Sequence, residues 1–445
     1  MKILLVHYRY FISGGPERYM FNIKKELEKS GHEVIPFSTR HSSNVKSKYE
    51  HFFTKNIGGE EGIFFDEYRK NAKTYLDVIG RQFYSFQVKN DLERIIRETR
   101  PDVCYLLHYV NKLSPSVITA CKRYNVPIVH RLSDYYLMCP QSGFFRDGRF
   151  CDECKDKKLS VIKHKCVKNS HAASCLKYLA YSFHNFVGIY DHINTFICTN
   201  NYMREKLIEF GFDKNKLAVN HTFFNSDTWN IDQTYQRNRL PQGKINLICV
   251  GNFDHSKGTY DLLQAIDSLK DLHSQFRLTL IGGRLKKEIA NVEKYISTNH
   301  LEDLVKVMPI TSTEKLIEVY QQADASILPS RIVENLPNVM LESLFFELPL
   351  VVPSFGSFKS TVDDTISFKF QAFDVTSLAN TLRTIINDPA KIEEKRQRCK
   401  QYLEKNFSKA AHVEKLIGIF ESVSHHKGQG IAQMQTRAIS IDYNH

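Results

Sequence analysis

Two acids stand eight residues apart in the segment RIVENLPNVMLES, at Glu334 and Glu342, with Pro337 between them. A proline lacks a backbone N–H and clashes with the preceding turn, so a single helix through all three residues is disfavoured. It fits better in the first turn of a helix that begins there. We therefore expect Glu334 in a loop and Glu342 inside the helix that follows. There Glu342 can accept hydrogen bonds from neighbouring hydroxyls, as on a ribose, and Glu334 from a sugar, so neither acid needs to carry a proton.

The start of this helix is a candidate anion site. Residues Leu336, Asn338 and Val339 offer unpaired N–H groups and the positive end of the helix dipole, and Asn335 directly precedes them. A diphosphate fits at such a place.

A second loop, VGNFDHSKG, is expected to face the same ligand. Gly251 lets the chain turn close to it, Asn252 follows, and Lys257 brings a positive charge to the start of another helix. The lysine is the counter-charge that a bound diphosphate requires.

Alternating strands and helices must position these loops. KILLV predicts a buried strand, residues 16–30 a helix, and HEVIPFS the next strand, and the same alternation restarts at INLICVG. Such alternation implies parallel sheets with crossover helices. The expected fold is α/β, with two Rossmann-like domains that face each other across a cleft.

The expected organisation follows the same pattern. The segments are an N-terminal domain over 1–225, a polar linker over 226–243, a second domain over 244–405, a helix over 408–424 that returns to the first domain, and a polar tail over 425–445.

Two further candidates follow strands of the first half. His108 ends DVCYLLH and Asp134 comes just after PIVHRL. Ligands of open α/β sheets bind beyond the carboxyl ends of strands, so both are catalytic candidates. The alternatives are a structural histidine and a helix-capping aspartate.

The bulk composition limits partners and compartment. The chain has 445 residues and a formal net charge of +12, which favours anionic partners or simply gives a solubilising basic surface. The N-terminus MKILLVHYRYF lacks the features of a signal peptide, and no segment approaches the length of a membrane span. We expect a cytoplasmic protein. The basic run over 155–165 indicates either a face toward anionic lipid on the inner side of the membrane or a solvated charged surface.

Four cysteines form a C-x11-C-x2-C-x11-C pattern at Cys139, Cys151, Cys154 and Cys166, within an insertion over about 139–175. This composition suits a structural zinc site, since four thiolates leave no open position for chemistry. The alternatives are buried or unpaired thiols and, more weakly, a redox pair. FRDGRF between them predicts a hairpin with an Asp-Gly turn.

The segments ENLPNVMLESLFFELPLVV, VGNFDHSKG and GGPER together resemble the family 4 retaining glycosyltransferases of the GT-B fold. The resemblance covers nearly the whole chain. It implies transfer of a hexose-type sugar from a UDP- or GDP-sugar donor to a glycan or lipid-linked acceptor in surface polysaccharide, lipopolysaccharide or glycolipid synthesis, without a catalytic metal and without nucleic acid. By resemblance, Lys257 binds phosphate, Glu334 lies near the donor sugar, Glu342 binds the ribose, and Gly15 lets the first helix approach the donor phosphate.

Two departures from the family pattern stand out. Asn252 occupies a position where relatives place a phosphate-binding arginine, and Arg331 or Arg284 is expected to supply that charge. Ser133 stands where relatives often place a histidine before Asp134. His130, Arg131 or Ser133 itself then takes that role.

Two other functions fit parts of the sequence. A sugar-nucleotide epimerase shares the two-domain fold and would convert a nucleotide sugar without an acceptor. A basic, zinc-dependent binding module without transferase activity would bind oligonucleotides in a salt-sensitive manner.

Overall fold

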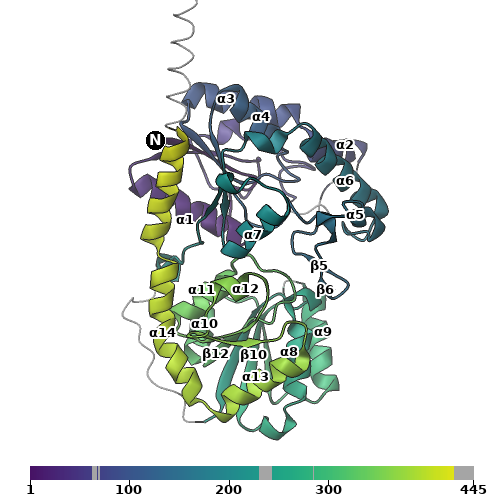
Figure 1. Cartoon of the computed structure of the whole chain (residues 1–445), viewed down its shortest axis with the longest axis vertical. Coiled ribbons are helices and arrows are strands. Elements are labelled where there is room, and N and C mark those ends of the chain that lie inside the picture. The colour runs from purple at the N-terminus through teal and green to yellow at the C-terminus, as the bar shows by residue number, and fades with distance from the viewer. Residues whose placement is uncertain (63–67, 69–70, 230–242, 284, 425–445) are drawn as a thin grey trace, which may run out of the picture.

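A computed structural model describes residues 1–62, 68, 71–229, 243–283 and 285–424. Two α/β halves lie one above the other, each built on a six-stranded parallel sheet (Figure 1). The strand order is β2-β1-β3-β4-β7-β8 in the first sheet and β11-β10-β9-β12-β13-β14 in the second. The expected fold, two Rossmann-like domains, is therefore confirmed.

The strands of the first half are β1 Lys2–His7, β2 Glu33–Phe37, β3 Val103–His108, β4 Ile128–Arg131, β5 Phe145–Arg146, β6 Arg149–Phe150, β7 Thr195–Cys198 and β8 Leu217–Val219. Those of the second half are β9 Ile245–Gly251, β10 Phe276–Gly282, β11 Val305–Pro309, β12 Ala325–Ile327, β13 Leu350–Pro353 and β14 Ser367–Phe370.

The helices of the first half are α1 Gly15–Lys29, α2 Ala72–Phe83, α3 Phe86–Thr99, α4 Ser116–Arg123, α5 Ser160–Lys163, α6 His171–Phe186 and α7 Asn201–Glu209. Those of the second half are α8 Thr259–Asp267, α9 Lys286–Thr298, α10 Thr313–Gln322, α11 Asn338–Phe345, α12 Gly356–Thr361, α13 Val375–Asn387 and α14 Ala390–Asn406.

Both faces of each sheet are buried, which explains the near-continuous apolar strands. Along β1, Leu4 and Val6 pack into one core while Ile3 and Leu5 pack into the core on the opposite face. Strand β9 divides its side chains between two cores in the same way. The alternation follows from the two-residue period of a strand.

Each sheet reverses its strand order beside its first strand. In the first sheet β1 lies between β2 and β3, and in the second β9 lies between β10 and β12. A crevice forms at the carboxyl ends of the strands at such a point. The loops after β1, β9 and β12 therefore lie where a ligand is expected.

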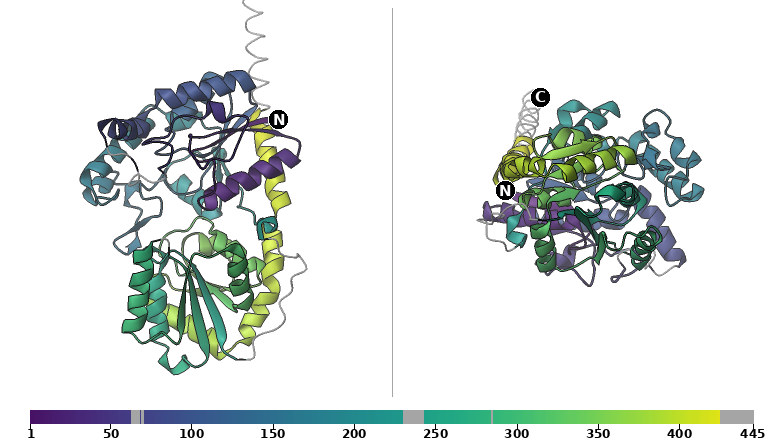
Figure 2. Two further views of the ribbon diagram at one scale, coloured as in Figure 1. Left: turned by 180° about the vertical axis from the view of Figure 1, so that it is seen from behind. Right: turned by 90° about the horizontal axis from the view of Figure 1, so that it is seen from below.

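The chain returns to its first half at the end. After α14, residues 409–424 form a further helix, and both Figure 1 and Figure 2 show this yellow segment running from the second half along the first. Val413, Leu416 and Phe420 pack in one core with Ile3 and Tyr105. The expected linker lies largely outside the described residues, at 230–242, and so does the tail over 425–445.

The hairpin in the cysteine segment is confirmed. Strands β5 and β6 pair antiparallel, and Asp147 and Gly148 between them both have positive φ, of 49° and 76°. These angles fit the two-residue turn that an Asp-Gly pair favours.

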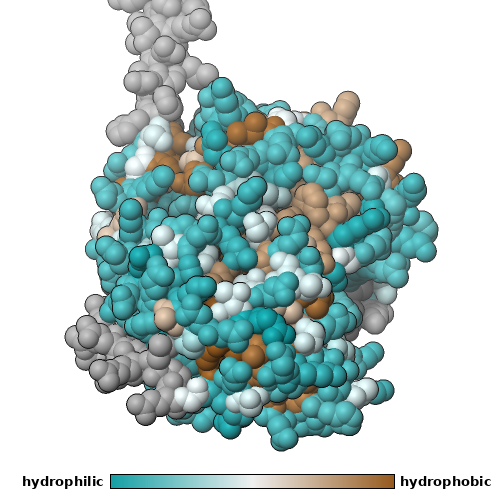
Figure 3. All heavy atoms as spheres, turned by 60° about the horizontal axis from the view of Figure 1, so that its bottom comes forward, coloured by the Kyte–Doolittle hydropathy of each residue, from teal (hydrophilic) through white to brown (hydrophobic). Residues whose placement is uncertain are grey.

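The outer surface is mostly polar. Figure 3 shows a hydrophilic face interrupted by separate hydrophobic patches. Among the described residues, no helix is long and apolar enough to cross a membrane.

Candidate functional site

An ion pair lies at the centre of the crevice. Lys257 follows β9 and Glu334 follows β12, and the lysine Nζ lies 2.6 Å from Glu334 Oε1. The same carboxylate oxygen accepts a hydrogen bond from Ser330 Oγ at 2.8 Å. The two loops that the sequence singled out therefore meet at charged groups.

The lysine turn is fixed by local contacts. The Asp254 side chain accepts the backbone N–H groups of Ser256 and Lys257. Gly258 ends the turn with φ of 73°, and a Cβ there would lie 1.9 Å from the carbonyl oxygen of Pro329. Only glycine avoids both the backbone strain and the clash at this point.

Helix α11 begins at Asn338, one residue later than Pro337, which is the N-cap rather than part of the first turn. Among the described residues no side chain caps the helix, so its first N–H groups have no side-chain partner at the cap. Glu334 lies in the loop and Glu342 in the helix, as the proline position predicted.

A cavity of about 240 Å³ lies in front of this helix start, and we call it the cleft cavity. The first half contributes Gly15, where a Cβ would lie 2.9 Å from Asn338 Nδ2. The residues that line the cavity and matter below are Gly15, Arg131, Ser133, Glu334, Asn335, Leu336 and Asn338. The structure thus brings together predicted residues from both halves.

Hydrogen bonds hold the acid-bearing loop to the first half. Asn200 Nδ2 donates to the carbonyl oxygen of Asn335 at 2.5 Å, and Asn335 Nδ2 donates to that of Leu132 at 3.3 Å. The Tyr135 hydroxyl donates to the Glu334 carbonyl oxygen at 3.1 Å. The position of Glu334 therefore depends on the contact between the two halves.

Glu342 lies deeper than Glu334. It is only 9% exposed, lines a small space beside Gly15 and Asn338, and accepts a hydrogen bond from the Tyr320 hydroxyl at 3.0 Å. Burial raises the pKa of this carboxyl, while the Tyr320 hydrogen bond and the positive charge of Arg18 partly oppose the rise.

His108 and Asp134 pair with each other, with His108 Nε2 3.7 Å from Asp134 Oδ2. Asp134 Oδ1 also accepts the Tyr136 backbone N–H at 2.9 Å. His108 Nδ1 is buried and has no hydrogen-bond partner among the residues that the structure describes. Neither residue lines the cleft cavity, although the adjacent Ser133 does.

Several predicted residues lie apart from the cavity. Arg331 pairs with Asp261 at 3.2 Å, so its charge is already used, and Arg284 lies outside the described residues. The Asn252 side chain is exposed, and Val339 packs against the core behind α11. Gly251 ends β9 with open space at its Cβ position.

Of the three residues suggested for the role of the family's histidine, two line the cleft cavity, Ser133 and Arg131. The Arg131 guanidinium lies 3.8 Å from the centre of the Tyr19 ring and donates to Ser133 Oγ at 3.0 Å and Thr222 Oγ1 at 2.6 Å. His130, another of the three, is buried and bonds the Leu106 carbonyl oxygen and Tyr136 inside the first half. The positive charge at the cavity wall is therefore Arg131.

The four cysteines of the C-x11-C-x2-C-x11-C pattern lie near one another. Burial raises the pKa of the Cys154 thiol to about 12, and nearby Cys139, Cys166 and Cys151 contribute to the rise. Among the described residues, however, no group of three or more His, Cys, Asp or Glu is arranged to hold a metal ion. The structure therefore gives no support to the zinc prediction.

Two protein-family models match consecutive parts of the chain. The model described as glycosyl transferases group 1 matches residues 230–406, and the model described as glycosyltransferase family 4 matches residues 13–228. The match therefore spans both halves and includes every residue of the cleft cavity.

Similar proteins extend over most of the chain. A 42.6 kDa protein in the cps region of Klebsiella pneumoniae is 24% identical over 355 residues, which is 78% of this chain and 83% of its own. The solved structure of HepE from Anabaena in complex with UDP superposes with a TM-score of 0.65 at 14% identity, over 95% of this chain and 100% of its own. The lipopolysaccharide outer core galactosyltransferase WaaB gives 0.62 at 13% identity, over 95% and 99%.

Proposed function

Because this chain belongs to the glycosyl transferases of group 1, family 4, with the GT-B fold, we propose that it transfers a sugar from a nucleotide-sugar donor with retention of the anomeric configuration. That the chain is a glycosyltransferase follows from the family itself. The proposed acceptor is a glycan or a lipid-linked saccharide in surface polysaccharide or glycolipid synthesis. The galactosyltransferase named for the lipopolysaccharide outer core and the UDP complex of HepE, both of this fold, support the proposal.

The observation that carries the proposal is that Glu334 lines the cleft cavity together with the start of α11 and pairs there with Lys257. A diphosphate at the helix start accepts hydrogen bonds from the first N–H groups of α11, and its negative charge attracts Lys257. The lysine then exchanges its contact with Glu334 for one with phosphate. Glu334 becomes free to accept hydrogen bonds from the hydroxyls of the donor sugar.

Glu342 is assigned to the ribose. It lies behind Gly15 and Asn338, one helical turn into α11, where a nucleoside extends from a diphosphate at the helix start. A buried carboxyl with one tyrosine partner retains the capacity to accept two adjacent ribose hydroxyls.

We assign to Arg131 the phosphate-binding positive charge that relatives place at the position of Asn252. Its guanidinium lies against the Tyr19 ring, and Arg131 lines the same cavity as the helix start. A planar guanidinium can bind two phosphate oxygens at once.

The chain's own groups act by positioning and electrostatics. In the proposed front-face displacement, the acceptor hydroxyl attacks from the side on which the diphosphate leaves, and a leaving phosphate oxygen takes the proton. The Lys257 ammonium and the helix start stabilise the negative charge that develops on this oxygen. His108 and Asp134 lie on the first-half side, where the acceptor enters, and their pairing orients the histidine ring.

We assign the protein to the cytoplasmic side of the cell membrane, in peripheral contact with anionic lipid. The basic segment over 155–165 in the first half supports this assignment.

The test begins with thermal stabilisation of the purified protein by UDP-, GDP- and ADP-sugars, since a bound donor raises the melting temperature. The stabilising donor is then offered with saccharide acceptors, and the product's anomeric configuration is read by NMR. Donor-dependent transfer with retention supports the proposal. Conversion of the nucleotide sugar without any acceptor would instead identify an epimerase, and the absence of stabilisation by all three donor classes would refute the site.

A further inference from the structure

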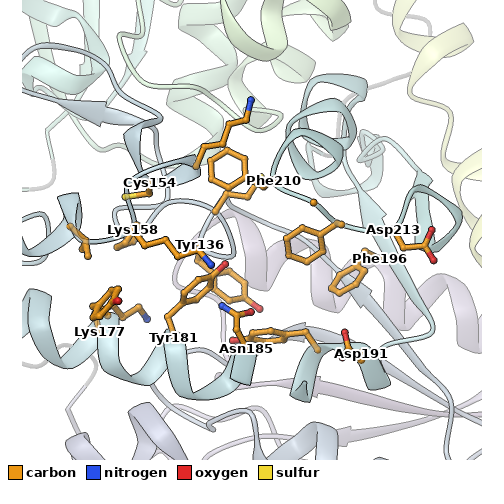
Figure 4. Close-up of a pocket in the computed structure, with 18 of the residues that line it drawn as sticks. Tyr136, Cys154, Lys158, Lys177, Tyr181, Asn185, Asp191, Phe196, Phe210 and Asp213 are labelled. Atoms are coloured by element: carbon orange, nitrogen blue, oxygen red, sulfur yellow. The ribbon is translucent and has the colours of Figure 1, made fainter. Parts of the chain in front are cut away.

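A second, larger cavity lies inside the first half. Its volume is about 480 Å³, and it opens between α6, the loop after β4 and the segment after α7 (Figure 4). We call it the aromatic pocket because seven aromatic side chains line it: Tyr136, Tyr178, Tyr181, Tyr190, Phe196, Phe210 and Phe212.

Two central phenols are engaged in the pocket wall. The Tyr136 hydroxyl donates to that of Tyr109 at 2.6 Å, and the Tyr181 hydroxyl donates to the Leu137 carbonyl oxygen at 2.7 Å. What these side chains present to the pocket is therefore mainly ring carbon. Such a wall suits a hydrocarbon better than a ligand that needs many hydrogen bonds.

Cations surround this apolar wall. Lys155, Lys158, Lys177 and Lys216 line the pocket against two acids, Asp191 and Asp213. Figure 4 labels Lys158 and Lys177 among the residues that line the pocket, together with Tyr136. The excess of positive charge favours an anionic group beside this apolar wall.

Lys177 lines the aromatic pocket and interacts electrostatically with Asp134, one of the catalytic candidates. Its Nζ donates to Asn111 Oδ1 at 3.0 Å, and burial lowers its pKa to about 8, a shift that the Asp134 charge opposes. The loop between β4 and β5 supplies Ser133 to the cleft cavity and Tyr136 to the aromatic pocket. A ligand in the pocket therefore lies beside the acceptor side of the cleft.

Helix α6 presents a different face to solvent. Lys177, Tyr181 and Asn185, four residues apart, line the pocket, whereas Leu179, Phe183 and Phe186 form an exposed apolar stripe. Phe186 is 90% exposed. An apolar stripe next to a pocket with a cationic lining matches an amphiphile whose chain continues into a bilayer.

We propose that the aromatic pocket binds the lipid end of the acceptor, a long-chain isoprenoid or alkyl diphosphate, with its phosphates at Lys177 and Lys158 and its chain against the aromatic rings. This inference rests on the proposed function, because it identifies the acceptor class of the same enzyme. A nucleotide is the less suitable occupant, since the hydroxyls of Tyr136 and Tyr181 are not free to read a base edge.

Binding of farnesyl diphosphate to the full chain tests the proposal, with farnesol and inorganic diphosphate as probes that carry only one of its two parts. We expect farnesyl diphosphate to bind at least about tenfold more tightly than either probe. Lys177→Met and Lys158→Met should each weaken its binding roughly tenfold, the size expected for one lost charged contact. Lys25→Met, at an exposed lysine on α1, should leave it unchanged.

Two variants separate this inference from the proposed function. Lys257→Met should retain farnesyl diphosphate binding, which excludes occupancy of the cleft by the diphosphate. Lys177→Met should retain stabilisation by the donor. The inference is overturned if inorganic diphosphate binds equally well, if UMP displaces farnesyl diphosphate, or if both pocket variants bind it like the wild type. Donor binding without farnesyl diphosphate binding defeats only this inference, and the reverse result defeats only the proposed function.

Discussion

Lys257 and Glu334 neutralise each other across 2.6 Å at the point where two loops of the second half meet. The pair is partly exposed, with 30% of the lysine side chain and 14% of the glutamate side chain accessible. An ion pair of this exposure contributes little to stability. Its value in the proposed mechanism is that an arriving diphosphate can separate it.

Substitution of either partner should therefore affect the reaction more than the fold. We expect Lys257→Met to weaken donor binding about 10- to 100-fold, because it removes one charge-assisted contact to phosphate. Glu334→Ala should lower kcat with a smaller change in donor affinity. Calorimetry and initial rates measure the two effects, and Lys270→Met, exposed in the same half, is the control. Wild-type rates in both variants would refute the assignment.

Substitution of Glu342 should weaken donor binding but stabilise the ligand-free protein. Burial raises its pKa, so ionisation opposes folding, and this cost appears as the pH rises above the ordinary glutamate value of about 4.3. Glu342→Gln should raise the Tm of the ligand-free protein by about 2–4 °C at pH 7.5, and the gain should vanish near pH 4. The same variant should bind the donor more weakly. A lower Tm at pH 7.5 would contradict this account.

Arg131 and Arg331 can be compared directly. Arg131→Lys keeps a charge in the cleft cavity but loses the planar fork, so we expect UDP to bind about tenfold more weakly while uridine binding is unchanged. Arg331→Lys should alter UDP affinity less, because that side chain already pairs with Asp261. Isothermal titration with UDP and uridine decides between them. The reverse order would restore Arg331 as the source of the missing charge.

Binding of farnesyl diphosphate should depend on pH near 8. Lys177 has a lowered pKa of about 8, so its charge is present below that pH and lost above it, whereas an ordinary lysine stays charged to about 10.4. The Asp134 charge raises the pKa of Lys177, and the Lys177 charge helps to lower the pKa of His184 on the same helix. Affinity should fall between pH 7 and 9 in the wild type and stay flat in Lys177→Met. A flat wild-type profile would count against Lys177 as the phosphate contact.

Gly258 should be far less tolerant of alanine than Gly31. Both have positive φ, of 73° and 81°, so both substitutions strain the backbone by about 1 kcal/mol. A Cβ at Gly31 meets nothing within 4 Å, whereas one at Gly258 would lie 1.9 Å from the Pro329 carbonyl oxygen. Gly258→Ala should therefore lower the free energy of unfolding by a further ~2 kcal/mol or more. Chemical denaturation of both variants measures the difference, and equal losses would mean that the contact between the loops is dispensable.

The sequence predicted those parts of the molecule that short-range rules control. Proline chemistry at Pro337 separated the environments of Glu334 and Glu342, and alternating apolar runs indicated both sheets. The position of Arg131 could not be predicted from the sequence, because Tyr19 and Thr222, which hold its guanidinium, are remote in the chain.

The sequence did not indicate helix α6, and the reason is a different one. Its side chains divide among a core face at Ala180, a pocket face at Tyr181 and an exposed apolar stripe at Phe183 and Phe186, so it lacks the single apolar face of a surface helix. Zinc at Cys139, Cys151, Cys154 and Cys166 stays a prediction without structural support, because spacing along the chain does not determine how closely sulfur atoms approach, and the described residues include no group arranged to hold a metal ion.

The last helix has a consequence for the order of events during synthesis. His412 Nε2 bonds the Tyr19 hydroxyl at 2.9 Å, and the Tyr19 ring lies against the Arg131 guanidinium. The wall of the cleft cavity is thus supported by residues 409–424, which leave the ribosome after both sheets. A nascent chain with both sheets formed therefore still lacks the His412 contact that supports this wall until the helix over 409–424 has docked.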